Sequence, residues 1–435
     1  MTTALLTDRY ELTMIEAALH SGRADRRSVF EVFARRLPDG RRFGVLAGTG
    51  RLLEAIADFR FADAELEWLE RERVVGRRTL DWLAAYRFRG DIVGYREGEV
   101  YLPNSPLLTV EGGFAEAVVL ETLVLSVLNY DTAVASAAAR MVAAAEGRPL
   151  AEMGSRRTSE ASAVAAARAA YIAGFDATSN LEAGRTWGIP TMGTAAHSFT
   201  LLHDTEEQAF RAQVETLGTG TTLLVDTYDI RRAVETAVRV AGTDLGAVRI
   251  DSGDLPSLVR EVRAQLDSLG ATGTRITVTS DLNEHTIAAL RGAPVDSYGV
   301  GTSVVTGSGA PAAGMVYKLV AHRDDDGSWV PVAKKSAEKA SHGGAKRAVR
   351  ELRGGVAVAE RIVVDADRDG VPEALEIDGR ELTVPLMRDG EAMPEFLGVP
   401  GTRSAREHRA VAIAELPVGA LRLSHGEAEI PTVFS

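Results

Sequence analysis

Short hydrophobic runs that break into polar or glycine residues at their C-terminal ends recur through the middle of the chain. They are PTMGTAAHS at 190–198, LLVDTYD at 223–229, VRIDSGD at 248–254, ITVTSDLNE at 276–284 and SYGVGTS at 297–303. Runs of this length, rich in Val, Ile and Leu and ended by turn residues, are typical of buried β-strands. Because helix-length segments separate most of them, the pattern predicts alternating strands and helices around a parallel sheet.

This alternation predicts the fold class of residues 113–320. The strand ends fall near residues 153, 176, 194, 226, 251, 280 and 300. Polar residues at each end favour an irregular (β/α) barrel of the TIM-like type, whose active face lies at the C-terminal ends of the strands. A doubly wound open sheet is the alternative, because strand spacing alone does not close a barrel.

The parts on either side of this region lack its periodicity. Residues 1–112 combine a helix pattern, TDRYELTMIEAALHSG, with a strand pattern, SVFEVFARRL, and so predict an α+β part. Residues 321–435 predict further strands and a helix near 404–414, and the basic stretch 334–353 is predicted to be a loop. We expect the N- and C-terminal parts to pack together as a second α+β domain.

Composition narrows the class of protein. The chain has 435 residues and is 45% hydrophobic and 25% charged, as is typical of a soluble globular protein with more than one domain. A net charge of −12 argues against general binding to nucleic acid or to an anionic membrane. The absence of Cys excludes disulfides, thiolate chemistry and Cys-based metal sites.

Two observations favour a cytoplasmic protein without a membrane span. The start, MTTALLTDRYELTM, lacks the basic region and apolar core of a signal peptide. The most apolar stretch, 114–145, carries Glu116, Glu121, Asp131 and Arg140, and its Ala-rich second half suits tight packing between helices better than contact with lipid.

The DSGD turn provides the first candidate chemistry. Asp251 and Asp254 follow an apolar strand and can bind ribose hydroxyls or a hydrated Mg²⁺. Alternatively, the two carboxylates only turn the chain and cap the next helix. Arg249 lies two residues before Asp251, so both side chains face the same side of the strand. An arginine inside a small barrel needs an anionic partner, because an unpaired buried charge is costly.

The segments TSD at 279–281 and GVGTS at 299–303 would end the last two strands. Barrels commonly bind phosphate there, through backbone N–H groups and the start of a helix. Gly299 and Gly301 would allow close approach of the backbone. Neither the GxGxxG dinucleotide fingerprint nor the Walker pattern GxxxxGK(S/T) occurs in the sequence.

His197 and Asp226 lie at consecutive strand ends. If the two side chains touch, the carboxylate would fix the imidazole tautomer and raise its basicity. A single histidine at a strand end more often has a structural role. The presence of Arg156, Arg157 and Asp251 on the same predicted rim favours a functional one.

These motifs together resemble the nicotinate phosphoribosyltransferase family. The resemblance covers the region from about Tyr101 to Lys318 and the N-terminal stretches TDRYELTM and FEVFARRLPDGRRFGVLAG. It rests on the combination of GSRRTSEAS, GTAAHSF, LLVDTYD, RIDSGDL, VTSDLNE and YGVGTSVVTG. It implies that nicotinate and phosphoribosyl diphosphate form nicotinate mononucleotide and diphosphate, with Mg²⁺ as cofactor. ATP hydrolysis would drive the reaction through a phosphorylated histidine.

The resemblance also implies a role for each candidate residue. His197 would be phosphorylated and Asp226 would orient it, while Asp251 and Asp254 would face the ribose and its Mg²⁺, directly or through water. The implied substrate-binding residues are Tyr10, Met153, Arg156, Arg157, Ser198, Arg249, Ser252 and Gly253. The residues implied to hold the 5′-phosphate are Ser280, Asp281, Gly299, Gly301 and Thr302.

The stacking partners of the pyridine ring are a special case. Tyr10 would reach the ring from a neighbouring subunit, which implies a homodimer with shared active sites. Relatives usually have Phe at the position of Met153, although methionine can also pack on an aromatic face.

Two other functions remain open at this stage. Nicotinamide phosphoribosyltransferase is the first, although no acidic residue that would favour an amide occurs in the Thr178-Ser179-Asn180 turn. The second is a catalytically silent barrel that binds a phosphate ligand, against which the intact set of His197, Asp226, Asp251 and Asp254 argues.

Overall fold

The computed structural model describes residues 4–333, 342–365 and 378–435. The chain divides into two compact units. The first consists of residues 1–136 and 310–435, and the second of residues 137–309. Each unit is described by itself below.

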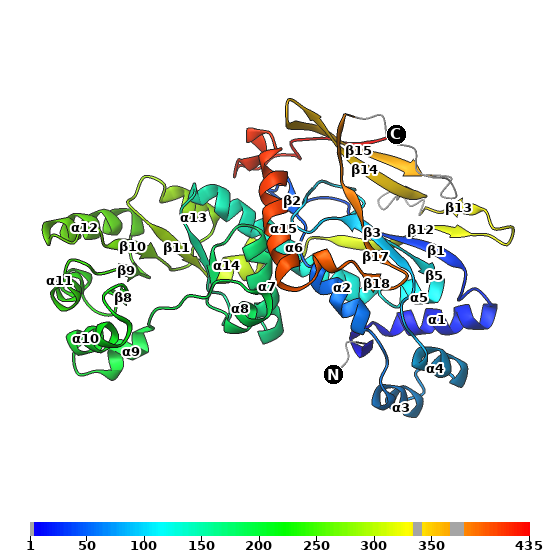
Figure 1. The fold of residues 1–435 in the computed structure, drawn as a ribbon, viewed down its shortest axis with the longest axis horizontal. Helices are drawn as coiled ribbons and strands as arrows, with labels where there is room; N and C mark the ends of the chain where they lie inside the picture. The colour runs from blue at the N-terminus through cyan, green and yellow to red at the C-terminus, as the bar shows by residue number, and fades with distance from the viewer. Residues whose placement is uncertain (1–3, 334–341, 366–377) are drawn as a thin grey trace. The chain divides into compact units, whose positions relative to one another are not determined.

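The second unit contains a six-stranded parallel sheet (Figure 1). Its strands are β6 (Leu150–Glu152), β7 (Ala177–Thr178), β8 (Thr222–Leu224), β9 (Ala247–Ile250), β10 (Arg275–Val278) and β11 (Ser297–Val300), in the order β7-β6-β11-β10-β9-β8. The last strand in sequence, β11, therefore pairs with the first, β6. This confirms the predicted α/β architecture with parallel strands.

The strand expected near residue 194 is reduced to a single bridge. Thr191 pairs with Thr178 in the parallel sense, next to β7. Pro190 has no backbone N–H and Gly193 follows three residues later, so the run is too short to form a ladder. Among the described residues, no ladder joins this bridge to β8. The parallel sheet therefore has six paired strands where the sequence pattern predicted seven strand ends.

Helices follow the strands of this sheet as the sequence pattern predicts. They are α7 (Glu160–Ile172), α8 (Leu181–Trp187), α9 (His197–Leu202), α10 (Glu206–Leu217), α11 (Ile230–Ala241), α12 (Leu255–Ser268), α13 (Glu284–Ala289) and α14 (Thr302–Val305). Thr205 and Gln208 form a capping box at the start of α10, Asn283 caps α13, and Pro256 stands in the first turn of α12. In Figure 1, α11 and α12 lie outside strands β8 to β10.

The first unit is built around a seven-stranded sheet with the order β13-β12-β1-β5-β3-β17-β18. Its strands are β1 (Arg27–Ala34), β3 (Asp91–Tyr95), β5 (Leu108–Gly113), β12 (Met315–Arg323), β13 (Trp329–Pro331), β17 (Thr383–Arg388) and β18 (Glu391–Ala392). Strands from the start of the chain form its centre, and strands from the C-terminal part pair on both sides of them. A pair of strands, β2 (Gly44–Val45) and β4 (Val100–Tyr101), lies nearby in the same unit.

A four-stranded sheet, β16-β14-β15-β19, completes the strands of this unit. It contains β14 (Ala345–Arg353), β15 (Val356–Asp365), β16 (Gly379–Glu381) and β19 (Thr432–Phe434). The loop predicted at 334–353 is thus wrong for residues 345–353, which form β14, and residues 334–341 lie outside the described residues. Lys346, within β14, is buried and pairs with Glu31 at 2.9 Å, which a solvated loop would not need.

The helices of the first unit are α1 (Arg9–Ser21), α2 (Thr49–Asp58), α3 (Asp63–Arg71), α4 (Arg77–Ala84), α5 (Phe114–Val118) and α15 (Gly398–Ala414), and α6 (Glu121–Ala145) begins in the first unit and ends in the second. Short 3₁₀ turns occur at Ala4–Leu6, Pro394–Phe396 and Val418–Leu421, and at Gly307–Gly309 in the second unit. The core of the first unit includes Phe30 and Tyr317, whose rings stack with centroids 4.9 Å apart.

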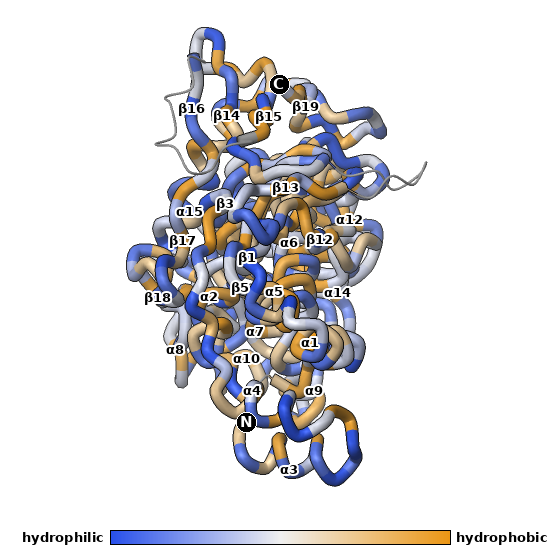
Figure 2. The backbone as a smooth tube through the Cα atoms, turned by 90° about the vertical axis from the view of Figure 1, so that its right-hand side faces the viewer, coloured by the Kyte–Doolittle hydropathy of each residue, from blue (hydrophilic) through white to orange (hydrophobic). Residues whose placement is uncertain are grey.

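The unit boundaries differ from the predicted ones at 113 and 320. The first falls inside α6, at Ser136, and the second at Ala310, before β12. Strand β12 belongs to the first unit because it pairs with β1 along its length. Segment Phe114–Ala145 is long and apolar enough to cross a membrane by length and composition alone, but 61% of its most apolar 18 residues is buried inside the protein. Figure 2 shows α5 and α6 as largely hydrophobic.

Candidate active site

A cavity of about 310 Å³ opens at the C-terminal ends of the parallel strands in the second unit. It is lined by Met153, Arg156, Arg157, Arg249, Asp251, Thr279, Ser280, Asp281, Gly299, Gly301 and Thr302. Every residue predicted to hold the 5′-phosphate lies in this lining, as do four of the predicted substrate-binding residues. The fold therefore brings together residues separated by up to about 150 positions in the sequence.

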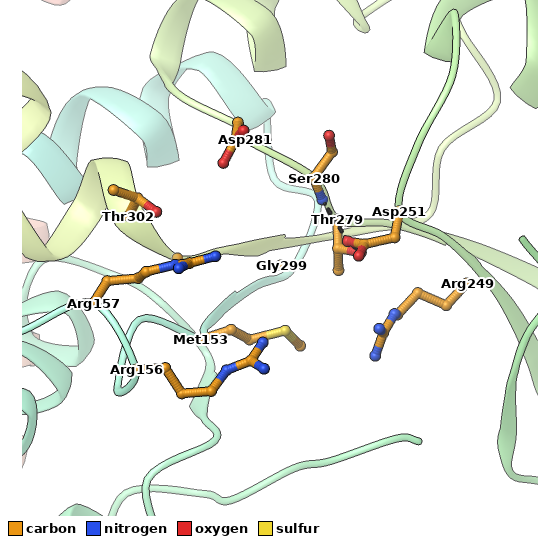
Figure 3. A pocket seen from close by; sticks show the side chains of 11 residues that line it. Met153, Arg156, Arg157, Arg249, Asp251, Thr279, Ser280, Asp281, Gly299 and Thr302 are labelled. Atoms are coloured by element: carbon orange, nitrogen blue, oxygen red, sulfur yellow. Dashed lines mark hydrogen bonds between the residues drawn. The ribbon is translucent and has the colours of Figure 1, made fainter. Parts of the chain in front are cut away.

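Three arginines give this cavity its charge. In Figure 3, Arg156 and Arg157 extend from one side and Arg249 from the other, toward the space around Met153. Among the described residues, no carboxylate lies within ion-pair distance of these three guanidinium groups. A cavity lined by unpaired guanidinium groups favours an anionic ligand, and carboxylate and phosphate groups match their planar donor geometry.

Arg249 is the most buried of the three. Its Nη1 donates to the hydroxyl of Thr194, while its buried Nε has no hydrogen-bond partner. Burial lowers the pKa of Arg249; the charges of Asp251 and Asp226 oppose this shift, and that of Arg156 adds to it. A bound anion would satisfy the unpaired Nε and offset the cost of burying the charge.

Asp251 is fixed by the end of the neighbouring strand. Its Oδ1 accepts hydrogen bonds from the Thr279 hydroxyl and, at 2.8 Å, from the backbone N–H of Ser280. Ser280 has φ = 91°, a left-handed conformation that is unfavourable for a residue with a side chain. This strained backbone aims the Ser280 N–H at Asp251 and leaves the other carboxylate oxygen, Oδ2, facing His197.

His197 is the first residue of α9 and is partly exposed. Its Nδ1 lies 3.1 Å from the hydroxyl oxygen of Thr227. Its Nε2 lies 3.9 Å from Oδ1 of Asp226 and 4.0 Å from Oδ2 of Asp251. One ring nitrogen is therefore within hydrogen-bond distance of a hydroxyl group, and the other faces two carboxylates across a gap too wide for a direct hydrogen bond.

Asp226 makes its hydrogen bonds to the DSGD turn and not to the histidine. Its Oδ2 accepts from the backbone N–H of Asp251 at 2.9 Å and from the hydroxyl of Ser252 at 2.8 Å. Its Oδ1 is buried and has no hydrogen-bond partner. A buried carboxylate oxygen without a donor is costly, so this atom is a natural acceptor for a donor on a ligand.

Besides His197, Asp226 and Tyr10, four predicted site residues lie outside the cavity lining. They are Ser198, Ser252, Gly253 and Asp254, and all four are exposed. Asp254 occupies the N-cap position of α12, but its side chain accepts no hydrogen bond from that helix. Its carboxylate is therefore not used in capping, which was the alternative to a functional role.

Tyr10 belongs to the first unit, where it lies on α1 with 45% of its surface exposed. Partial burial raises the pKa of its hydroxyl, and the negative charge of Glu121 adds to this shift. The ring is thus an exposed aromatic surface whose hydroxyl stays protonated at neutral pH.

Met153 and Gly299 determine the floor of the cavity. A Cβ atom at position 299 would lie 2.7 Å from Sδ of Met153 and 2.7 Å from Cγ2 of Thr279. Only glycine fits this approach, because real Cβ contacts are not that short. The methionine side chain is therefore packed directly on the backbone of β11.

Sequence reasoning missed three threonines at strand ends. Thr194 bonds Arg249, Thr227 contacts His197, and Thr279 bonds Asp251. Thr227 and Thr279 are each adjacent in sequence to a predicted site residue, Asp226 and Ser280. That adjacency was the available signal, but which hydroxyl meets which charged group depends on the curvature of the sheet.

The side chains of the site that could bind a metal ion are carboxylates. Among the described residues, no group of three or more His, Asp or Glu side chains could hold a metal ion. Asp251 retains one carboxylate oxygen without a hydrogen bond, and the Asp254 carboxylate is exposed. One or two carboxylates completed by water and substrate phosphates are the usual ligands of Mg²⁺, so these residues fit a metal that arrives with its substrate.

Comparison with known proteins places the chain among related sequences and structures. Residues 5–129 match the model of the nicotinate phosphoribosyltransferase (NAPRTase) N-terminal domain. Nicotinate phosphoribosyltransferase pncB1 of Mycobacterium tuberculosis is 57% identical over 436 residues, which cover 98% of this chain and 94% of that protein. Nicotinate phosphoribosyltransferase of Bacillus subtilis is 38% identical over 358 residues, which cover 80% of this chain and 73% of that protein.

The fold is also similar to a solved human structure. The crystal structure of human nicotinic acid phosphoribosyltransferase matches with a TM-score of 0.83 and 25% identity. The match covers 99% of this chain and 97% of the human chain.

Proposed function

The chain belongs to the nicotinate phosphoribosyltransferase family, and we propose that it uses the arginine-lined cavity of its second unit to join nicotinate to phosphoribosyl diphosphate. The products are nicotinate mononucleotide and diphosphate, and the reaction is the first step of NAD salvage from nicotinate. The observation that carries this proposal is the cluster of Arg156, Arg157 and Arg249 without carboxylate partners. Both substrates are anions, and such a cluster binds them.

The proposed chemistry follows from the charges at the strand ends. When the bond from ribose C1 to the diphosphate oxygen breaks, its electron pair leaves with diphosphate and positive charge develops on the sugar. The carboxylate of Asp251, which Thr279 and Ser280 hold in place, stabilises that positive charge. The pyridine nitrogen of nicotinate attacks C1 with its own lone pair, so no strong base is required.

The 5′-phosphate is proposed to bind at the ends of β10 and β11. Gly299 and Gly301 line the cavity there together with the hydroxyls of Ser280 and Thr302. Mg²⁺, held by Asp251 and Asp254 with the substrate, would neutralise the diphosphate as it leaves.

His197 is proposed to couple ATP hydrolysis to this reaction. With its proton on Nδ1 toward Thr227, the neutral ring presents the lone pair of Nε2. Nε2 attacks the γ-phosphorus of ATP, the bond to the β–γ bridging oxygen breaks, and ADP leaves with the electron pair. Water later hydrolyses the phosphohistidine. The energy of ATP would thus change the binding of substrates and products.

Preference for the acid over the amide is supported by the turn after β7. The Asn180 side chain makes two hydrogen bonds within the protein: its Oδ1 accepts from the backbone N–H of Ala183 at 2.9 Å and its Nδ2 donates to Ser155 at 3.0 Å. No side chain of the Thr178-Ser179-Asn180 turn carries a charge, so the turn offers no carboxylate to the amide group of nicotinamide.

We propose an irregular TIM-like (β/α) barrel for the second unit, supported by the pairing of β11 with β6. We propose a cytoplasmic homodimer in which Tyr10 of one subunit stacks on the pyridine ring in the other. Sedimentation at assay concentration tests the dimer, and an active monomer would contradict it.

The decisive experiment compares the two pyridine substrates. Purified protein is given phosphoribosyl diphosphate, Mg²⁺ and ATP, with either nicotinate or nicotinamide, and mononucleotide formation is followed. We expect a kcat/KM for nicotinate about 10- to 150-fold higher, since removing the charge from one partner of a charged hydrogen bond costs about 1.5–3 kcal/mol. Equal values for the two substrates would refute the assignment of the arginine-lined cavity.

A further inference from the structure

A second cavity lies at the opposite end of the same parallel sheet. Its volume is about 310 Å³, and it is lined by the starts of β6, β7, β10 and β11, where the first cavity is lined by the strand ends. Parallel barrels place their catalytic groups at the C-terminal ends of the strands. This second cavity therefore lies outside the site described above.

The cavity exists because the side chains that line the sheet there are small. Ala151 pairs with Gly299 on one side and with Ala177 on the other. On the neighbouring strands, Thr277 pairs with Ser297, and their hydroxyls are hydrogen-bonded to each other at 2.9 Å. Interiors of parallel barrels are usually filled by Val, Ile and Leu. Leaving space in a packed interior costs stability, so a cavity of this size needs an explanation.

A single side chain, Met153, lines both cavities. It packs against the bare backbone of Gly299, and no other lining residue is common to the two cavities. Methionine is unbranched and has several rotatable side-chain bonds, so it can change shape at little cost. The partition between the two spaces is therefore deformable.

The mouth of the second cavity carries fixed charges. Asp176, Arg275 and Asp296 are exposed there. Oδ2 of Asp176 accepts from the backbone N–H of Leu150 at 3.1 Å, and Oδ2 of Asp296 accepts from that of Ile276 at 2.7 Å. Two carboxylates against one guanidinium give the rim a negative balance, and the strand amides hold both carboxylates in place.

We propose that this cavity is an accessory binding site for a slender molecule with an apolar body and a cationic amine at one end. The amine would lie at the rim with Asp176 and Asp296, where charge complementarity favours it. The apolar body would extend toward Met153. The side chains that provide the apolar walls are Leu150, Ala151, Met153, Ala177 and Met192.

Three probes of nearly equal shape test the charge requirement on the unmodified full-length protein. They are 4-phenylbutylamine, 4-phenylbutan-1-ol and 4-phenylbutyrate, and binding is measured by calorimetry. We expect the amine to bind at least about tenfold more tightly than the carboxylate, a difference that corresponds to 1.4 kcal/mol. No binding of the amine, or an equal affinity for the carboxylate, would overturn the proposal.

Substitutions that fill the cavity test its location. Ala177→Leu and Ala151→Leu each place an isobutyl group in the space, and Ala289→Leu makes the same change at an exposed position at the end of α13. We expect each of the first two variants to weaken amine binding at least about tenfold while mononucleotide synthesis without probe stays unchanged. We expect no effect of Ala289→Leu.

Asp296→Asn provides an independent test of the rim charge if a variant with a filled cavity does not fold. This change at the exposed rim should weaken binding of the amine and leave binding of the alcohol unchanged. Amine binding that survives both the filling of the cavity and the loss of the rim charge would show that the probe binds elsewhere.

Discussion

The hydroxyl oxygen of Thr227 lies 3.1 Å from Nδ1 of His197. This contact sets the orientation of the imidazole ring, because Nε2, the other nitrogen, then points toward Asp226 and Asp251. When the hydroxyl accepts a hydrogen bond from Nδ1–H, the proton of the neutral ring is on Nδ1 and Nε2 carries the lone pair. The residue that positions the histidine in this structure is therefore a threonine, while the nearby carboxylate of Asp226 holds the DSGD turn.

Thr227→Val removes this hydroxyl and keeps the shape of the side chain. We expect the rate of ³²P transfer from γ-labelled ATP to the protein to fall about 5- to 10-fold, since one neutral hydrogen bond contributes about 1 kcal/mol. Thr227→Ser should restore it, and ³¹P NMR of the wild type should show phosphorylation on Nε2. Unchanged labelling in Thr227→Val would show that the contact does not orient the ring.

His197→Ala removes the proposed phosphoryl acceptor. We expect complete loss of ATP hydrolysis and of the stimulation of synthesis by ATP. Some ATP-independent synthesis should remain, because Asp251 and the arginine-lined cavity are intact. The measurement is acid-labile, base-stable ³²P incorporation together with mononucleotide formation. Undiminished labelling of His197→Ala would place the acceptor on another residue.

Arg249→Met removes a buried guanidinium but keeps most of the length of the side chain. Hydrogen bonds to charged groups contribute about 1.5–3 kcal/mol, so we expect kcat/KM for nicotinate to fall about 10- to 150-fold. Arg239→Met is a matched control, since Arg239 is exposed on α11 and pairs there with Glu207 of α10 and Thr236 of α11, away from the cavity lining. Equal effects of the two substitutions would argue against a specific role for Arg249.

Glu11 makes the stability of the first unit depend on pH. It is buried on α1, and burial raises its pKa to about 7 although Thr122 donates two hydrogen bonds to its carboxylate. The folded state therefore holds the proton more tightly than the unfolded state, whose carboxyl has its ordinary pKa of 4.5. This stabilising contribution is complete below the unfolded pKa and is lost as the pH rises through about 7.

Glu11→Gln tests this dependence by mimicking the protonated form. We expect the difference in melting temperature, variant minus wild type, to be lowest near pH 5 and to increase as the pH rises to 8. The reason is that only the wild type has to ionise a buried carboxyl over this range. Thermal unfolding followed by circular dichroism at several pH values gives the comparison. A constant difference between the two proteins across this range would mean that Glu11 does not titrate in the folded state.

The sequence by itself determined the local elements and the chemistry available to them. Short runs of β-branched residues that end in DSGD, TSD or GVGTS form strands because their side chains favour a pleated, buried surface. Their polar ends meet at one edge because parallel strands share a direction. The family was also recognisable in this way, because its motifs combine specific residues at specific places along the chain.

The tertiary structure alone decided which of these side chains meet. The seventh expected strand shrinks to the bridge at Thr191, since neighbouring strands and Pro190 limit its pairing, and no local pattern reports on that. The assignment of β12 to the first unit depends on its partner, β1, almost 300 residues earlier. Likewise, the pairing of Thr227 with His197 and the cavity left by Ala151 and Ala177 arise from sheet register and curvature. These are non-local properties, which side-chain packing fixes only when the chain is folded.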